Sequence, residues 1–401
     1  MRRQGGSPSS THSAAPGAQN GKPGAPLQQA ENLDAVHEAP TEEDERIFLA
    51  ITSTTLTPEE EARITAPDTV AARQANVLAV HWHPEHVPMQ LIERRIQASF
   101  PNKAQELIIP TQHNEITTYG TYSGVEVDCY SAGFNQKVQL LLHFENRVLP
   151  RSGVLRSMLA HTFRYRSSQL FEFLSVLTGK DEERLQAVAA FTGAAEETIR
   201  FARLHARKLE ALLERHQDGL PAGAIKNKLV RNFLDAMRPR YGDRLVARVQ
   251  AFVQTVKLRV KDDFPLLYFY RASEVIEEAR GMGAGVVIPH PEQFWPILLA
   301  EYDVDGYEVW NPQSQRYTDF LIEVLARKNR KAKGEARKLL VFMGDDTHLS
   351  EKLLQRGQSG KPPREVGLQP AWDDLSVRKR LLAAGMDRAS VINEYSARLA
   401  S

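Results

Sequence analysis

Short apolar runs recur from residue 76 onward, and a histidine or a carboxylate lies in or just after each run. Runs of this length suit strands that are buried on both faces, as in a parallel α/β sheet or barrel. Because the same arrangement recurs six times, strands are a better interpretation than short buried helices. The runs are Val77–Val80 before His81, Leu107–Ile109 before His113, Gly124–Val127 with Glu126 inside it, Val138–Leu142 before His143, Val286–Ile288 before His290, and Leu339–Phe342 before Asp346 and His348.

The stretch from about residue 150 to 280 has another pattern, with apolar residues three or four positions apart. That spacing predicts amphipathic helices, and Gly219-Leu220-Pro221 and Arg238-Pro239 interrupt them. The stretch carries 23 basic against 16 acidic residues, an excess of seven. We expect a moderately basic helical insertion between two halves of an α/β domain. It could guide an anionic substrate or serve as a surface for oligomerisation or partner docking.

The two ends of the chain differ from its middle. Residues 1–45 are rich in Gly, Ser, Pro, Ala and Gln, so we expect them to be disordered. Thr57 and Pro58, with acidic residues after them, are typical of a helix start within a leading helical segment, 46–75. The expected organisation continues with the two halves of the α/β domain at 76–149 and 281–356, the insertion at 150–280, and a linker with C-terminal helices at 357–401.

Composition narrows the possibilities only a little. The 51 basic and 50 acidic residues nearly balance, so bulk charge does not indicate a nucleic-acid or membrane-binding protein. No stretch approaches the roughly 18 consecutive apolar residues of a membrane span, and the single Cys129 excludes an internal disulfide. We expect a cytoplasmic protein that does not bind membranes. Cys129 is expected to be a small buried side chain, since nothing in its neighbourhood would activate it as a nucleophile.

The histidines and carboxylates near the strand ends suggest a metal site. In a strand, His81 and His83 project to the same side, so both imidazoles can reach one ion. A parallel barrel brings the carboxyl ends of its strands to one rim, where His113, Glu126 and Asp346 would join them. Cations would offset the crowding of titratable groups there. The alternative, that these histidines are structural and no metal binds, remains open.

The order of the motifs resembles that of the PHP (polymerase and histidinol phosphatase) superfamily, and the resemblance covers residues 76–146 and 281–355. It implies a distorted (β/α)7 TIM-like barrel with a helical insertion, whose rim holds two to three divalent ions, commonly manganese, iron or zinc. The motifs read His81-Trp82-His83, Gln112-His113-Asn114, Gly124-Val125-Glu126, Leu142-His143, Pro289-His290-Pro291 and Gly344-Asp345-Asp346-Thr347-His348.

The resemblance also implies a ligand set, with Glu126 as a bridge between two ions because one carboxylate offers two oxygens. Glu126, Asp346 and His348 would be the catalytic members of that set. Two positions depart from the superfamily: Pro88 stands where an Asp is usual, so Glu85 or His86 would have to replace it, and Gln112 precedes the third histidine in place of another Asp. The implied metal ligands are His81, His83, Glu85 or His86, His113, Glu126, His143, His290, Asp346 and His348.

The expected function is hydrolysis of phosphate esters by metal-activated water. The substrate would be a phosphomonoester, or a phosphodiester in a nucleotide or short nucleic acid. The alternative is a degenerate module that binds metal or a phosphorylated ligand without turnover and acts as an interaction subunit. Secondary candidates have softer support. Glu308, in the strand-like segment Tyr307–Asn311, could support a ligand from behind or contact the substrate, and Asp128 could support a ligand. Arg151, Arg164 and Arg166 could meet a phosphate, although a solvated helix face is the commoner role of such residues.

Overall fold

A six-stranded sheet lies at the centre of the computed structural model, which describes residues 38–332, 337–353 and 364–401. Its strand order is β4-β5-β6-β7-β8-β9, with antiparallel pairing from β4 to β7 and parallel pairing from β7 to β9. The strands are β4 (Thr117–Tyr119), β5 (Tyr122–Ser131), β6 (Gln136–Glu145), β7 (Gly285–Ile288), β8 (Gly306–Trp310) and β9 (Leu340–Met343).

The antiparallel direction of β6 corrects the expectation of parallel strands throughout. Only residues 132–135 connect β5 to β6, and a turn of that length can join antiparallel strands alone, because a parallel connection needs a long crossover. As a result, His143 near the carboxyl end of β6 pairs with Gly285 at the beginning of β7.

Two short parallel pairs lie beside the large sheet: β1 (Asn76–Ala79) with β3 (Gln105–Ile108), and β2 (Trp82–His83) with β10 (Thr347–His348). Backbone contacts link them to both sides of the large sheet. Beyond β3, His113 forms a parallel bridge with Glu126 on β5. Beyond β9, the Asp346 amide donates to the His81 carbonyl at 3.0 Å. The segments that carry the histidines therefore meet at one place in the fold.

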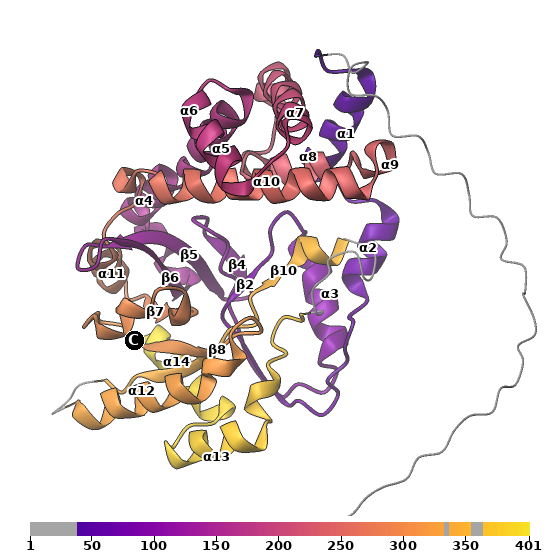
Figure 1. The fold of residues 1–401 in the computed structure, drawn as a ribbon. Helices are drawn as coiled ribbons and strands as arrows, with labels where there is room; N and C mark the ends of the chain where they lie inside the picture. Colours follow the sequence, from indigo (N-terminus) through magenta and orange to yellow (C-terminus); the bar gives the residue numbers. More distant parts are fainter. Residues whose placement is uncertain (1–37, 333–336, 354–363) are drawn as a thin grey trace, which may run out of the picture.

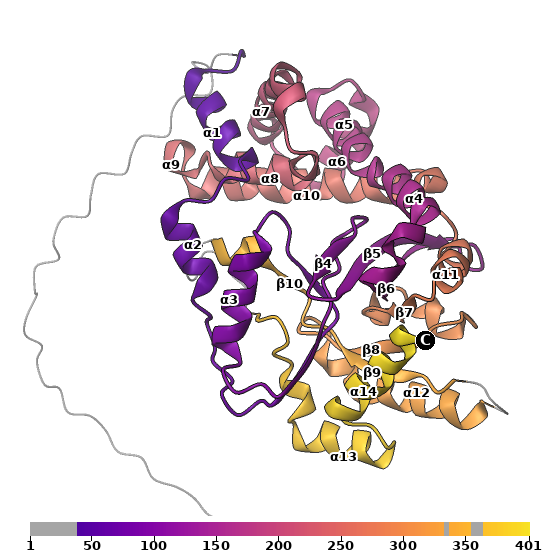
Figure 2. The same cartoon turned by 180° about the vertical axis from the view of Figure 1, so that it is seen from behind.

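Helices cover the sheet and share its hydrophobic core (Figures 1 and 2). They are α4 (Gly153–Phe163), α11 (Ala272–Gly281), α12 (Thr318–Lys331), α13 (Leu375–Ala383) and α14 (Arg388–Ala400). A smaller apolar cluster joins α2 (Pro58–Thr65) and α3 (Met89–Ser99) to β1 and β2. None of the helices among the described residues is long and apolar enough to cross a membrane.

A helical bundle with a hydrophobic core of its own lies against one side of this assembly, with α10 next to the sheet (Figure 1). Between residues 150 and 281, all of which are described, the regular structure is helical apart from an isolated bridge of Arg271 with Tyr130. The bundle contains α5 (Tyr165–Thr178), α6 (Glu182–Thr192), α7 (Glu196–His216), α8 (Lys228–Asp235), α9 (Arg238–Tyr241) and α10 (Asp243–Asp263), and α1 (Glu42–Thr52) packs on it.

Element boundaries differ from the expected ones at three places. Helices α4 and α11 fall within the range expected for the insertion, yet they pack on the sheet through Leu155 and Val275. Helix α1 begins inside the segment expected to be disordered, because Thr41 caps it and Phe48 is fully buried in the bundle. The rest of that segment, 1–37, and residues 354–363 around the expected linker lie outside the described residues.

Candidate metal centre

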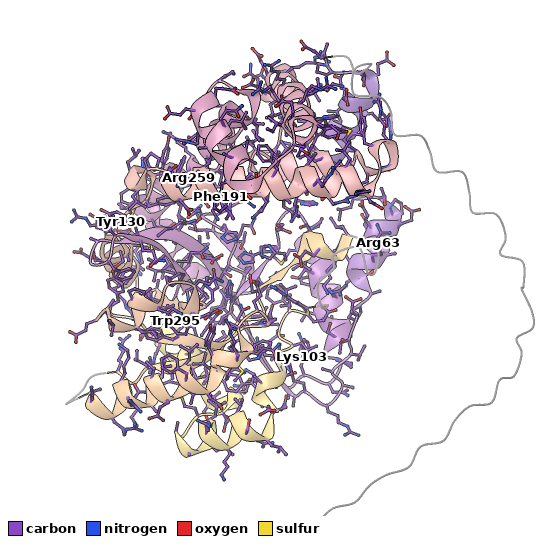
Figure 3. The ribbon with its side chains drawn as sticks, viewed as in Figure 1. Arg63, Lys103, Tyr130, Phe191, Arg259 and Trp295 are labelled. Carbon is purple, nitrogen blue, oxygen red and sulfur yellow. The ribbon has the colours of Figure 1, made fainter. Side chains whose placement is uncertain are left out.

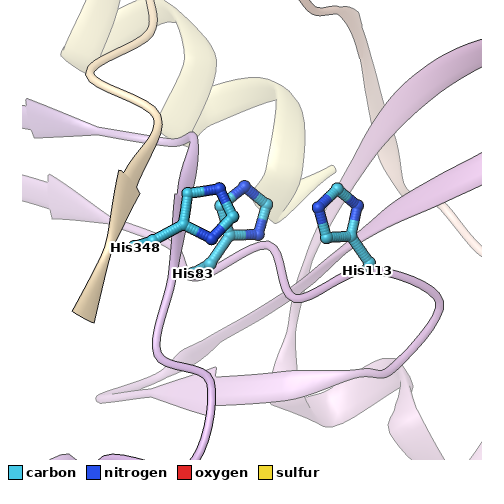
Figure 4. A group of neighbouring side chains, drawn as sticks. All are labelled: His83, His113 and His348. Atoms are coloured by element: carbon cyan, nitrogen blue, oxygen red, sulfur yellow. The ribbon is translucent and has the colours of Figure 1, made fainter. Parts of the chain in front are cut away.

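Three imidazole rings gather where β2, β10 and the segment after β3 meet (Figure 4). The rings of His83 and His348 are stacked with centroids 4.2 Å apart, because these residues are direct partners in the β2–β10 pair. The ring of His113 lies 4.5 Å from that of His83 and 6.1 Å from that of His348. One nitrogen from each of the three rings lies within 4.8 Å of the other two, a spacing that one metal ion can span.

Glu126 occupies the buried side of this cluster, and its carboxylate is 1% exposed. Its Oε2 lies 3.6 Å from His83 Nε2 and 2.7 Å from His113 Nδ1. Its Oε1 faces His81 Nε2 at 3.9 Å and His290 Nε2 at 3.5 Å. One carboxylate on β5 therefore faces four imidazoles from three different segments, the arrangement expected of a residue shared between two ions.

Asp346 closes the cluster on the solvent side. Its Oδ1 lies 3.3 Å from His83 Nε2, 3.5 Å from His348 Nε2 and 3.7 Å from His81 Nε2. Its Oδ2 pairs with the Arg364 guanidinium at 3.0 Å. Asp346 thus faces histidines and an arginine with different oxygens.

Backbone strain is concentrated at this site. Among the described residues, five that are not glycine have a positive φ, and four of them lie in or beside the cluster: Glu85, Asn114, His290 and Asp346. Left-handed backbone is uncommon for residues with a Cβ atom and costs on the order of 1–3 kcal/mol. Strain of this kind persists where the surroundings fix a side chain in one place, and it is frequent at functional sites.

Glu308 on β8 supports two of the histidines from behind. Its Oε1 lies 2.6 Å from His81 Nδ1, and its Oε2 accepts the backbone N–H of His290 at 2.9 Å. Gly344 makes room for this carboxylate, since a Cβ at that position would overlap it. A carboxylate on Nδ1 keeps one ring proton there, so a metal that displaces the other proton can bind the Nε2 lone pair of His81.

The charges of the cluster depend on one another. Burial disfavours the charged form of His81, but the nearby carboxylates, Glu308 foremost, outweigh it and raise its pKa to about 10. Burial and the neighbouring rings of His348 and His113 lower the pKa of His83 to about 3. Burial also opposes ionisation of Glu126, yet the histidines around it hold the pKa of its carboxyl well below the ordinary value. At neutral pH the cluster therefore offers an ionised carboxylate and a neutral imidazole.

Several atoms of the cluster lack hydrogen-bond partners although they are buried. They are His81 Nε2, His83 Nε2 and Glu126 Oε2, and one ligand atom from each of these residues lies within 4.8 Å of the other two. Glu126 Oε2 approaches His113 Nδ1 at ion-pair distance, but the geometry of this contact is not that of a hydrogen bond. Buried polar atoms without partners are costly, about 1–3 kcal/mol each, so their convergence requires an explanation. Imidazole and carboxylate ligands suit zinc, iron and manganese. The residues therefore fit divalent ions.

His143 was expected to be a ligand, and that prediction is wrong. Its Nε2 contacts the Val80 carbonyl at 2.8 Å and its Nδ1 contacts the Tyr395 hydroxyl at 2.8 Å, so protein atoms engage both ring nitrogens. Burial lowers its pKa to about 3. The cause is the reversed direction of β6, which carries His143 to the amino end of β7, whereas His290 follows the carboxyl end of that strand.

Glu85 and His86 were alternatives for one ligand position, and only Glu85 lies at the cluster. Its Oε1 is 3.4 Å from His348 Nδ1, and its Oε2 accepts the Ser350 N–H at 2.9 Å. The ring of His86 is largely exposed and belongs to neither of the histidine–carboxylate groups described above. Pro88 is the N-cap residue of helix α3, directly before Met89.

Of the secondary candidates, only some contact the residues around the cluster. Asp128 accepts hydrogen bonds from Asn114 Nδ2 at 2.7 Å and from the Tyr165 hydroxyl at 2.9 Å, so it anchors the residue after His113. Arg166 is buried and donates to the His113 carbonyl at 3.3 Å. Arg151 instead donates to the Met282 carbonyl, Arg164 is exposed, and Cys129 is buried.

A cavity of about 440 Å³ opens in front of the cluster, and sequence reasoning missed most of its lining. One wall contains His113, Asp346 and His348. The opposite wall comes from the helical bundle and is strongly basic. The cationic residues that line the cavity are Lys137, Arg166, Lys226, Lys228, Arg231, Lys257, Lys261 and Arg364. The excess of basic residues in the insertion indicated a positively charged surface in the sequence, but it did not identify which residues line the cavity.

Comparisons with known proteins add little to this geometry. No family description matches the chain, and no curated protein matches it. A solved structure from Bifidobacterium adolescentis, named a "putative metal-dependent phosphoesterase", is 16% identical over 78% of this chain and 98% of its own, with a TM-score of 0.39. A TM-score of this size does not establish a shared fold, so the functional argument rests on the site.

Proposed function

We propose that this protein hydrolyses phosphate esters with two or three divalent ions bound at the histidine–carboxylate cluster. One observation carries the proposal. Buried nitrogen and oxygen atoms of His81, His83 and Glu126 converge without hydrogen bonds. Their neighbours in the cluster, His113, Asp346 and His348, line a cavity whose far wall is basic. A divalent ion would satisfy the buried atoms, and an anionic substrate would suit the basic wall of the cavity.

Membership of the PHP superfamily, with its distorted (β/α)7 barrel, is part of the same proposal. The backbone contacts support it: β3 continues to a bridge with β5, and β9 continues to a hydrogen bond with the segment before β2. Contacts of this kind are what a barrel would need to join the two short strand pairs to the six-stranded sheet. The motif order in the sequence agrees with this arrangement.

Bound divalent ions would supply Lewis-acid stabilisation of phosphoryl oxygens and would lower the pKa of water toward about 7. The chain's own residues have distinct tasks. His81, His83 and Glu126 would hold one ion, and His83, His113 and His348 surround a neighbouring position. Glu308 keeps the proton of His81 on Nδ1. Arg364 and Arg166, which both line the cavity, could orient the phosphate through N–H donors.

The rival proposal is a degenerate module that binds metal or a phosphorylated ligand without turnover. A specific observation favours it, because His143 is occupied by protein contacts and Pro88 replaces a usual carboxylate. The cluster therefore has fewer ligands than the superfamily pattern implies. An incomplete ligand set can retain metal and still lack the geometry for hydrolysis.

A substrate panel distinguishes the two proposals. Purified protein is assayed with manganese, iron or zinc against p-nitrophenyl phosphate, bis(p-nitrophenyl) phosphate, nucleotides and a short oligonucleotide. We expect hydrolysis that a chelator abolishes and that Asp346→Asn lowers by roughly 100-fold or more. The matched control is Asp319→Asn, a carboxylate whose side chain is 52% exposed on α12. Metal binding with no turnover across the panel would favour the degenerate module, and hydrolysis that persists after chelation would contradict both.

A further inference from the structure

The basic wall of the cavity extends beyond the reach of a single phosphate at the cluster. Lys228, Arg231 and Lys257, from α8 and α10, line the large cavity and also a smaller adjoining one of about 100 Å³. These two helices belong to the bundle, whereas the cluster belongs to the sheet. The cations therefore continue away from the cluster over the surface of the bundle.

These side chains lack the acidic partners that surface cations commonly have. Among the described residues, no carboxylate lies within ion-pair distance of Lys226, Lys228, Arg231 or Lys257. By contrast, Arg248 and Arg259, on the same helix α10, pair with Glu197 and Asp263. Lys228, Arg231 and Lys257 thus face the cavity without a carboxylate of the described residues at ion-pair distance. They differ in this from two other cations of the lining, Lys137 and Arg364, which pair with Asp128 and Asp346.

Like charges crowd one another along this wall. Burial lowers the pKa of Lys226; the charge of Glu85 opposes this shift, and the charges of Arg166 and Lys228 add to it. Burial, with Lys261 and Arg231 nearby, lowers the pKa of Lys257. Unpaired cations held close together are destabilising on their own, and a bound anion would relieve their repulsion.

The cavity also has an apolar portion. Phe264, Leu266 and Phe269 line it beside the lysines. A volume of about 440 Å³ falls within the range of small-molecule sites, roughly 300–1,000 Å³. The lining therefore suits a compact ligand with an apolar or flat body and more than one anionic group.

We propose that Lys228, Arg231 and Lys257 form a second phosphate site for the substrate that reacts at the cluster. The substrate is then a small molecule with at least two phosphate groups: one is hydrolysed, and the other is held by α8 and α10. This inference rests on the proposed function for the first phosphate. It adds that the helical bundle selects substrates by a charge remote from the reacting bond.

Matched substrate pairs test the inference. The pairs are AMP with adenosine 3′,5′-bisphosphate and fructose 6-phosphate with fructose 1,6-bisphosphate, and kcat/KM is measured for each. A charge-assisted contact contributes enough to predict a preference for the bisphosphate of roughly 10- to 100-fold in at least one pair. The double variant Lys228→Gln/Lys257→Gln should bring that ratio close to one.

The control is Arg248→Gln/Arg259→Gln, which removes two positive charges from α10 outside the cavity; Figure 3 labels Arg259. These side chains are 50% and 62% exposed, so this variant should keep both the ratio and the activity of the parent protein. The inference is overturned if the parent protein shows no preference, or if both double variants change the ratio equally. Hydrolysis of the monophosphates would leave the proposed function intact in either case.

Calorimetric titration keeps the second site testable if no substrate is turned over. Adenosine 3′,5′-bisphosphate and, separately, AMP are titrated into the metal-loaded parent protein and into both double variants. The lysine variant should bind the bisphosphate roughly 10-fold or more weakly than the control variant does. Equal affinities would refute the second site. A 5′-phosphorylated tetranucleotide is tested last. If the protein prefers it to both bisphosphates, the substrate is a nucleic acid and the inference of a small-molecule substrate is wrong.

Discussion

Replacing Glu308 with glutamine should weaken metal binding, because this buried carboxylate holds two parts of the cluster through two different oxygens. Oε1 lies 2.6 Å from His81 Nδ1, and Oε2 accepts the His290 N–H at 2.9 Å. A carboxylate can accept from both, whereas an amide has one acceptor and one donor end. In the Glu308→Gln protein, either the His81 ring or the His290 amide must therefore face an NH2 group.

The expected loss follows from that mismatch. A buried donor left without an acceptor costs about 1–3 kcal/mol, and a supporting partner of a metal-bound histidine typically contributes 10- to 100-fold in affinity. We therefore expect the dissociation constant for zinc or manganese to rise roughly 10- to 100-fold. The substitution also removes the charge that most raises the pKa of His81.

The assay is a competition titration of metal between the protein and a chromophoric chelator. The control, Glu323→Gln, removes a carboxylate that is 46% exposed on α12 and paired with Arg327. Thermal unfolding of the metal-free proteins separates lost affinity from lost folding. Equal metal affinity in the parent, Glu308→Gln and Glu323→Gln proteins would refute the role assigned to Glu308.

Three further substitutions probe other parts of the structure. His143→Phe leaves the Val80 carbonyl and the Tyr395 hydroxyl without their partner, so urea unfolding should show a loss of about 1–3 kcal/mol, while metal affinity stays within a few-fold; loss of metal would restore His143 as a ligand. Burial lowers the pKa of His205 to about 4, below its unfolded value of about 6.5, so its contribution to stability is complete above pH 6.5 and is lost as the pH falls toward 4. His205→Phe should make the fall in unfolding free energy over that window shallower by about 1.4 kcal/mol per pH unit, and an unchanged slope would contradict the assignment. Cys129→Ala should keep phosphoesterase activity within a few-fold, because the thiol is buried and burial raises its pKa; loss of activity in a folded protein would show that the thiol matters.

The strands and most cluster residues could be predicted because they depend on local sequence. His81 and His83 share a side of their strand by its two-residue repeat, and each apolar run marks a buried strand. Glu308 was a candidate for a supporting residue or a substrate contact because it lies in the strand-like segment Tyr307–Asn311. These features need no knowledge of how distant segments meet.

The wrong prediction for His143 and the missed cavity residues have a different origin, since both depend on strand direction or on how the bundle packs. His143 follows an apolar run just as His113 does. However, the short β5–β6 connection makes β6 antiparallel to its neighbours, so His143 lies at the amino end of β7, away from the cluster. Likewise, the helical pattern predicts which residues are polar on α8 and α10. It does not say that Lys228 and Lys257 face the cavity, because that depends on contacts between segments far apart in the chain.

The most direct test of the metal centre is anomalous diffraction from crystals grown with zinc or manganese. The account predicts at least two anomalous peaks, with ligand distances of about 2.0–2.3 Å. One should lie among His81, His83 and Glu126, and the other beside His113 and His348. A metal-loaded crystal with no peak at these side chains, or with peaks only elsewhere on the protein, would contradict the central claim.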